Sequence, residues 1–203
     1  MDGAGVCTNC DATTVTGAIE NGTPEAIQAQ LDITAAYADA STRATGLCTL
    51  GAFTEIAGPQ GACAGYTDPP GSLGPTGFPT YLPGLYWSAS TIDLGVGFTI
   101  VLDAQGDADA VFIFQAGSAI TTGTGSEIIL VNGAQAKNVW WMAETAATLG
   151  VTSIFKGTAI ANTAAISVLN GTDLIPTEVE GRLFSLGDAI SVDHDATITV
   201  PAP

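Results

Sequence analysis

The chain has 203 residues, a formal net charge of −16 with only four Lys and Arg residues, and 25 glycines. This length predicts a single domain over residues 1–203 with a sizeable core. So few cations leave nothing to neutralise a phosphate backbone, which argues against nucleic acid and against an anionic membrane surface as partners. Charged residues make up only 12% of the chain, which favours an all-β, repetitive fold with Ala, Thr and Ser on its wet faces.

The cysteines are Cys7, Cys10, Cys48 and Cys63, and this even count indicates disulfides made in an oxidising compartment. Cys48 and Cys63 share one long irregular segment, so we predict that they are bonded and fasten it, with Cys7 and Cys10 as a second candidate pair. Cys7 and Cys10 could alternatively form half of a zinc site, but the sequence has no second CxxC and only one histidine, His194.

No stretch is long and apolar enough to span a bilayer, and the N-terminus lacks the pattern of a signal peptide. We therefore expect no membrane insertion, and we expect an export signal to lie outside this sequence if the protein is secreted.

The clearest helix is predicted at residues 24–42. Thr23 can cap it, Pro24 suits its first position, Glu25 favours its positive end and Arg43 its negative end. Three- and four-residue spacing predicts that the helix packs lengthwise through one face. That face would contain Ile27, Leu31, Thr34, Tyr37 and Ala38.

Residues 44–83 are rich in Gly, Pro, Thr and Ser, which predicts an irregular, cap-like excursion. From about residue 85 to 200 the chain is a run of short strands in which four segments superpose: Gly117–Thr121, Thr145–Leu149, Thr163–Ser167 and Gly187–Ser191. Their central alanines, at 119, 147, 165 and 189, are 28, 18 and 24 residues apart by subtraction. Such spacings predict the coils of a β-solenoid, along which a helix of about 30 Å can lie.

Alternation along these segments predicts which side chains point inward and which outward. The inward set is Ile92, Ile120, Thr148, Ile166 and Ile190. A first outward ladder is Thr91, Ala119, Ala147, Ala165 and Ala189. A second outward ladder is Asp93, Thr121, Leu149, Ser167 and Ser191.

Three stretches, Leu102–Gly106, Ala110–Gln115 and Leu130–Trp140, closely resemble signature sequences of the ice-binding (antifreeze) proteins of polar bacteria, fungi and algae. The resemblance runs from about Thr14 to the C-terminus. It implies a mainly β fold, a right-handed β-solenoid (β-helix) of roughly triangular section with one long α-helix packed alongside. The family normally has strands ahead of the Thr14 stretch, so we expect part of a coil to be missing.

The resemblance also implies binding to an ice crystal surface through one flat solenoid face, which gives thermal hysteresis or inhibits ice recrystallisation. It implies no cofactor, and the residues themselves lead us to expect no metal and no enzymatic activity. We accordingly expect a secreted, monomeric, acidic protein of cold adaptation.

Members of the family often carry a Thr-Ala/Gly-x-Thr/Asn pattern at the turns of the ice-binding face. The matching turns here are Leu94–Gly97, Thr122–Gly125, Leu149–Thr152 and Asn170–Asp173. With the outward ladders, these turns supply the candidate ice-binding residues Ala119, Thr121, Thr122, Thr124, Ala147, Leu149, Val151, Thr152, Ala165, Ser167, Thr172, Ala189 and Ser191.

Two other functions compete with ice binding. An adhesion or glycan-binding solenoid module of a larger extracellular protein would use the same face, and exposed Trp or Tyr would mark it. A polysaccharide-cleaving solenoid would need poised carboxylates, and the nearest cluster is Asp103, Asp107 and Asp109. We interpret these three as turn formers that bind backbone, and not as catalytic groups or calcium ligands. His194 alone assembles no catalytic triad.

Overall fold

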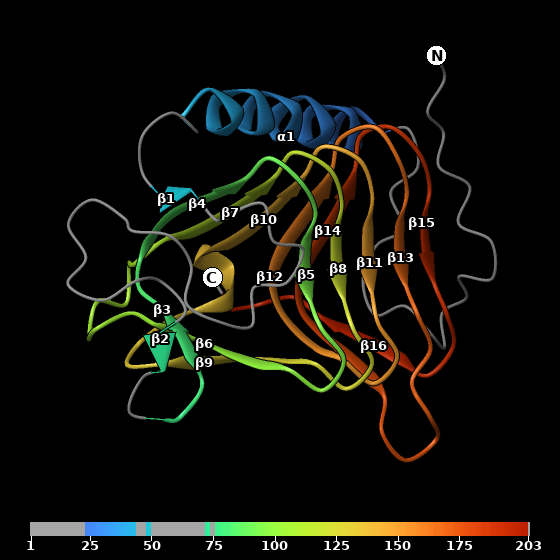
Figure 1. Ribbon diagram of the computed structural model, residues 1–203. Coiled ribbons are helices and arrows are strands. Elements are labelled where there is room, and N and C mark those ends of the chain that lie inside the picture. The colour runs from blue at the N-terminus through green and yellow to red at the C-terminus, as the bar shows by residue number, and fades with distance from the viewer. Residues whose placement is uncertain (1–22, 44–47, 50–71, 74–75, 203) are drawn as a thin grey trace.

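The computed structural model describes residues 23–43, 48–49, 72–73 and 76–202. These residues form a β-solenoid of three walls with one helix lying along it (Figure 1). The predicted mainly β solenoid with a long helix alongside is therefore confirmed. Within the described part, no helix has the length and apolarity needed to cross a membrane.

Two walls of the solenoid join into one 11-stranded sheet. The first wall contains β1 (Cys48–Thr49), β4 (Gly84–Ser88), β7 (Phe112–Ala116) and β10 (Val139–Ala143). The second wall contains β2 (Ser72–Leu73), β3 (Pro79–Tyr81), β6 (Thr99–Asp103), β9 (Glu127–Val131) and β16 (Ala196–Thr199). The longer strands β12 (Ile154–Ala161) and β14 (Thr177–Ser185) continue from the second wall into the first. A short 3-10 turn, η1 (Ala136–Asn138), precedes β10.

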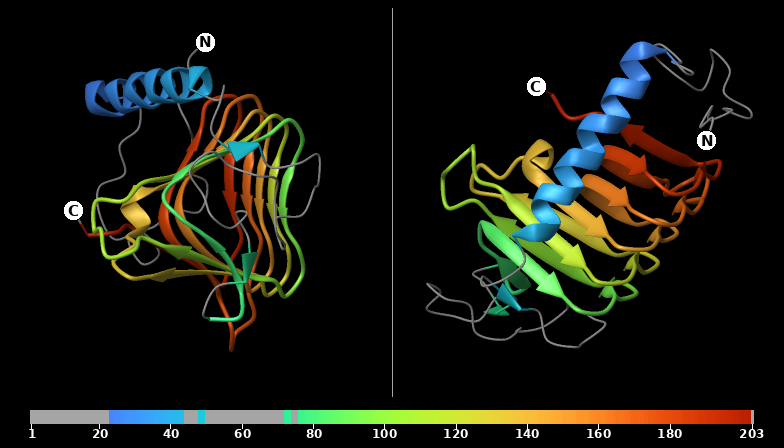
Figure 2. Two further views of the ribbon diagram at one scale, coloured as in Figure 1. Left: turned by 60° about the vertical axis from the view of Figure 1, so that its left-hand side comes forward. Right: turned by 90° about the horizontal axis from the view of Figure 1, so that it is seen from above.

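The third wall is a separate five-stranded sheet with the order β15-β13-β11-β8-β5. Its strands are β5 (Ile92–Leu94), β8 (Ile120–Thr122), β11 (Ala147–Leu149), β13 (Ile166–Val168) and β15 (Ile190–Val192). Each strand pairs in parallel with the equivalent strand of the next coil. Figure 2 shows these coils stacked in chain order beside the helix.

The irregular segment predicted at residues 44–83 ends earlier than expected. Pro79–Tyr81 already forms β3, in which Thr80 pairs with Val101 of β6. The sequence did not predict this strand for two reasons. The residues before it are rich in Gly and Pro, and a strand of three residues is too short to show a periodic pattern. Most of the remaining segment lies outside the described residues.

Gly157 lets β12 turn the corner between two walls within one strand. Its φ is +118°, and a Cβ there would lie 2.8 Å from both the Cβ and the carbonyl oxygen of Val139. The two coils before β12 make the same corner with inserted loops at residues 104–111 and 132–138. These insertions explain why the first repeats are longer than twenty residues.

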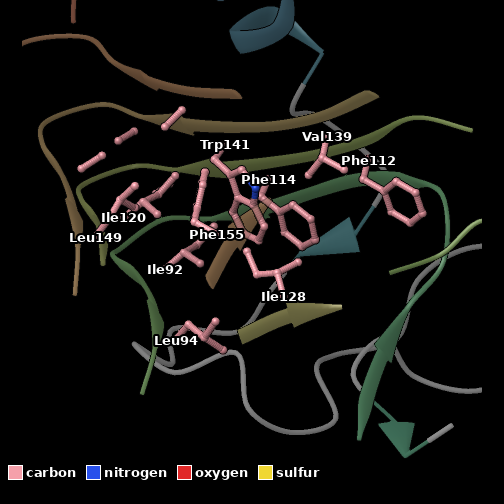
Figure 3. Close-up of a cluster of buried hydrophobic side chains, with 14 of the residues drawn as sticks. Ile92, Leu94, Phe112, Phe114, Ile120, Ile128, Val139, Trp141, Leu149 and Phe155 are labelled. Carbon is pink, nitrogen blue, oxygen red and sulfur yellow. The ribbon is translucent and has the colours of Figure 1, made fainter. Parts of the chain in front are cut away.

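The core is built from identical positions of successive coils (Figure 3). Tyr86, Phe114 and Trp141 are aligned by strand pairing and stack along the solenoid axis. Ring centroids are 4.9 Å apart between Tyr86 and Phe114 and 4.1 Å apart between Phe114 and Trp141, with interplanar angles of 16° and 9°. The spacing between strands, about 4.8 Å, sets this repeat and makes equivalent residues direct neighbours.

The helix α1 (Pro24–Thr42) has the predicted bounds, and the predicted cap is present. The Ala26 N–H donates to Thr23 Oγ1 at 3.2 Å. The predicted packing face, however, is only partly right: Tyr37 contacts the wall, but the other four residues of that face do not pack on it. Ile27 and Leu31 are 54% and 59% exposed, and Thr34 and Ala38 are also exposed.

The face of α1 that packs on the first wall is the neighbouring stripe through Ile33, Tyr37 and Ala40. Ile33 contacts Met142 and Ile160. Gln115 Nε2 donates to the Ala40 carbonyl at 2.6 Å, and the Tyr37 hydroxyl donates to Glu144 Oε2 at 2.8 Å. Both stripes have three- and four-residue spacing, so only these contacts with the wall decide between them.

The environment of Tyr37 shows how closely the helix docks. Burial, with Glu144 next to the hydroxyl, holds the pKa of Tyr37 well above its usual value. The phenol therefore stays protonated and keeps donating to the carboxylate.

The predicted disulfides fall almost entirely outside the described residues. Cys7, Cys10 and Cys63 lie outside them, and only the backbone of Cys48 is described, in β1.

Candidate functional site

The five-stranded sheet presents two columns of small side chains outward. Strand pairing aligns the first, here called the hydroxyl column: Asp93, Thr121, Thr148, Ser167 and Ser191. In β5, β8, β11 and β13 the strand residues on either side of this column are buried. Ile120 and Leu149, for example, are 1% and 0% exposed. In β15, by contrast, Ile190, predicted to point inward, and Val192 are 42% and 45% exposed, because no further strand in the described part of this sheet covers them.

The second, here called the alanine column, lies two residues earlier: Thr91, Ala119, Ala146, Ala165 and Ala189. Backbone hydrogen bonds fix its alignment. The carbonyls of Ala119, Ala146, Ala165 and Ala189 accept the N–H groups of Ile92, Ile120, Ala147 and Ile166 of the preceding coil, at 3.0 to 3.2 Å. The two columns together make a regular array repeated at the strand spacing of about 4.8 Å.

Two residues predicted to point outward from β11 point inward. Ala147 and Leu149 are 1% and 0% exposed, and Figure 3 shows Leu149 among the core side chains. Thr148, predicted to be inward, pairs with Thr121 and Ser167 in the hydroxyl column. The superposition of the four repeats placed Ala147 where Ala146 belongs, and this one-residue shift exchanged the inward and outward side chains of β11.

The missed residues Ala146 and Thr148 carried a recognisable signal. A glycine follows the third strand residue in three consecutive coils, at Gly95, Gly123 and Gly150. Alignment on these glycines would have placed Ala146 with Ala119 and Thr148 with Thr121.

Four of the five turns that follow strands of the third wall share one backbone conformation, the exception being the loop after β13. Gly97, Gly125, Thr152 and Asp195 have positive φ values of +68°, +67°, +54° and +61°. Each lies just before a strand of the second wall. The corner between the third and second walls is therefore made with a residue in the left-handed conformation, which glycine adopts most easily. Thr124 is exposed, and Val151 and Thr152 are half-buried, at this corner.

Two of the turn residues predicted for the site do not join a continuous row. Thr122 is buried at 7% exposure, and its hydroxyl accepts the Gly150 N–H at 2.9 Å. Thr172 lies in a loop at residues 169–176 that protrudes from the corner (Figure 1), where the Ile175 N–H donates to its hydroxyl at 3.0 Å. The turns therefore form an interrupted row, whereas the third wall is regular.

The other two walls are poorly suited to a flat neutral contact. The helix covers the first wall. The second wall carries charged side chains outward, including Lys156 and Glu180, which pair at 2.8 Å. In contrast, the two columns of the third wall contain a single ionisable residue, Asp93.

The remaining candidates have structural roles. Asp103 Oδ1 accepts the Gln105 N–H at 2.8 Å and Asp107 Oδ1 accepts the Asp109 N–H at 2.9 Å, so the predicted turn role of Asp103 and Asp107 is confirmed. In the described part of the chain, no group of three or more His, Cys, Asp or Glu could hold a metal ion.

The tryptophans do not form a stacking platform for a sugar. Trp141 is 2% exposed in the core. Trp140 and Trp87 are half-buried on the wall that the helix covers. A glycan-binding role therefore finds no support on the third wall.

Comparison with known proteins gives one consistent result. Residues 2–199 match the sequence model of a family described as Ice-binding-like. The chain is 37% identical over 118 residues to ice-binding protein 1 of Shewanella frigidimarina, and 40% identical over 94 residues to ice-binding protein K3-B1 of Typhula ishikariensis. These matches cover 58% and 46% of this chain, but only 12% and 36% of the two relatives.

Solved structures agree with the sequence matches. An ice-binding protein from an Antarctic biological consortium superposes with a TM-score of 0.68 at 31% identity, over 89% of this chain and 68% of that one. A domain of the Shewanella frigidimarina protein gives a TM-score of 0.65 at 25% identity, over 95% of this chain and 71% of that one.

Proposed function

The chain belongs to the Ice-binding-like family, and on that premise we propose that it binds ice through the hydroxyl and alanine columns of the third wall. The observation that supports this choice of wall most strongly is the alignment of Thr121, Thr148 and Ser167 beside small alanines, without Lys, Arg or Glu. The relatives described above are named ice-binding proteins, which supports ice as the ligand.

The chemistry of such a contact follows from the array. Methyl groups order the water above them, and hydroxyls hydrogen-bond to that water. Because the columns repeat at about 4.8 Å, the ordered water acquires a regular spacing that can merge with a crystal lattice. A contact of this kind depends on flatness and needs no catalytic residue or cofactor.

The proposal is tested by placing a bulky side chain in the middle of the array. Ala165→Tyr should abolish ice shaping and lower thermal hysteresis, because a ring standing above the sheet holds the lattice away. Ala165 is only partly exposed, but the next residue, Ile166, is 0% exposed, so alternation turns Ala165 away from the core. The free energy of unfolding should therefore change by no more than ~0.5 kcal/mol. Circular dichroism and growth of a single ice crystal measure the two effects.

Thr197→Tyr provides the matched control, because Thr197 is an exposed residue of β16 in the second wall. It should leave ice shaping unchanged. If Ala165→Tyr stays folded and arrests ice as well as the parent does, the contact lies elsewhere, and the corner residues Thr124, Val151 and Thr152 become the candidates.

We further propose that the protein acts outside the cell as a monomer. Its four cysteines and its relationship to ice-binding proteins support this setting. Light scattering during the ice assays checks the monomeric state, and a dimer mass would contradict it.

A further inference from the structure

Asp93 is the one ionisable side chain in the two outward columns of the third wall. It lies in β5, the edge strand of the five-stranded sheet, and pairs with Thr121 of β8. Its neighbours Ile92 and Leu94 are 1% and 3% exposed, so alternation turns the carboxylate outward. The β5 row therefore differs in charge from the other four rows.

Asp93 also orients the adjacent row. Thr121 Oγ1 donates to Asp93 Oδ1 at 2.5 Å. A hydroxyl has one proton, and Thr121 uses it in this bond. Thr121 can therefore accept hydrogen bonds from water but has no proton left to donate. At the opposite edge, the corresponding bond from Ser191 to Ser167 joins two neutral groups at 3.3 Å.

A carboxylate at this position is poorly suited to contact with a neutral lattice. Removing an ionised carboxylate from liquid water is costly unless a cation replaces its hydration. Ion pairs in the described part of the chain involve Asp39, Glu180 and Asp195, and not Asp93. Seating ice on the β5 row would therefore require stripping water from an unpaired charge.

We propose that Asp93 ends the ice contact at β5 and confines it to the rows of β8, β11, β13 and β15. This inference rests on the proposed function and names the residue that limits the size of the site. Its consequence is that the natural chain binds ice less strongly than its fold allows.

The test replaces Asp93 and measures thermal hysteresis at equal molar concentration. Asp93→Thr extends the neutral hydroxyl column to β5, so activity should rise about twofold or more. Asp93→Asn should give a smaller rise, because the amide removes the charge but still accepts the proton of Thr121. Asp109→Asn, which removes the same charge from the exposed loop between β6 and β7, should leave activity unchanged.

Several outcomes overturn the proposal. The proposal is wrong if the Asp93→Thr variant folds but its thermal hysteresis is no greater than that of the parent. Where Asp93→Thr does not fold, the isosteric Asp93→Asn variant decides, and an unchanged activity rejects the proposal. A gain that appears only with dimers in light scattering also rejects it, because the carboxylate would then serve to block edge-to-edge strand pairing.

The two hypotheses fail in different ways. A folded parent protein that does not shape ice contradicts the proposed function and removes the basis of this inference with it. A parent that shapes ice, together with unchanged Asp93 variants, contradicts only the inference.

Discussion

At the scale of single residues, the solenoid depends on positions where neighbouring coils touch backbone to backbone. Gly157 and Gly181 are paired across β12 and β14, and a Cβ on Gly181 would lie 1.7 Å from the Gly157 carbonyl oxygen. Glycine is required here because of this close approach, and at Gly157 also because of its positive φ.

Gly157→Ala should lower the free energy of unfolding by ~2 to 4 kcal/mol, since it combines backbone strain with a clash against Val139. Gly106→Ala is the matched control. Gly106 has a φ of +94°, and a Cβ at this position would have no atom within 4 Å, so strain alone should cost about 1 kcal/mol. Denaturant titration measures both, and equal losses would contradict the role of the close contact.

At the scale of elements, the helix is held by a narrow set of contacts with the first wall. Ile33 is its one buried residue, and Tyr37 and Ala40 supply the polar contacts with Glu144 and Gln115. A helix this exposed depends on tertiary docking more than on its own propensity.

Ile33→Ala should therefore destabilise the protein by about 2 kcal/mol or more, because it opens a cavity against Met142 and Ile160. Leu31→Ala, at a residue that is 59% exposed, should stay within ~0.5 kcal/mol of the parent. Thermal unfolding followed by circular dichroism separates the two variants. A larger loss from Leu31→Ala would show that the packing stripe runs through Ile27 and Leu31 instead.

At the scale of the whole molecule, charge is distributed unevenly over the walls. The net charge of −16 favours repulsion between chains in solution. Asp93 alone brings that charge onto the two outward columns of the third wall. The protein thus combines a strongly acidic surface with one nearly neutral array.

A disulfide would affect the stability of the whole molecule, and we propose that Cys48 and Cys63 are bonded. Such a bond closes a loop of 15 residues by subtraction, which corresponds to about 3 kcal/mol of stabilisation through the unfolded chain. Peptide mapping without reductant should find the linked pair, and the Cys48→Ser variant should unfold at lower denaturant concentration. Both thiols found free in carefully oxidised protein would contradict the pairing.

Much of the architecture could be predicted from the sequence, because the features concerned are local. The bounds of α1 follow from Thr23, Pro24 and the residues after them, and the coils follow from repeated short strands. The outward positions of Thr121, Ser167 and Ser191 follow from two-residue alternation within each strand.

Only the tertiary structure decided the features that depend on contacts between distant segments. Ala146 and Ala147 are both compatible with the alternation within β11; the glycine that follows each strand hinted at Ala146, and the pairing of β11 with β8 and β13 established that it faces outward. Likewise, α1 has two stripes of suitable spacing, and its docking on the first wall selects the one through Ile33. A one-residue shift or a rotated helix keeps the local spacing of apolar residues but exchanges core and surface, and the packed neighbours show which alternative is present.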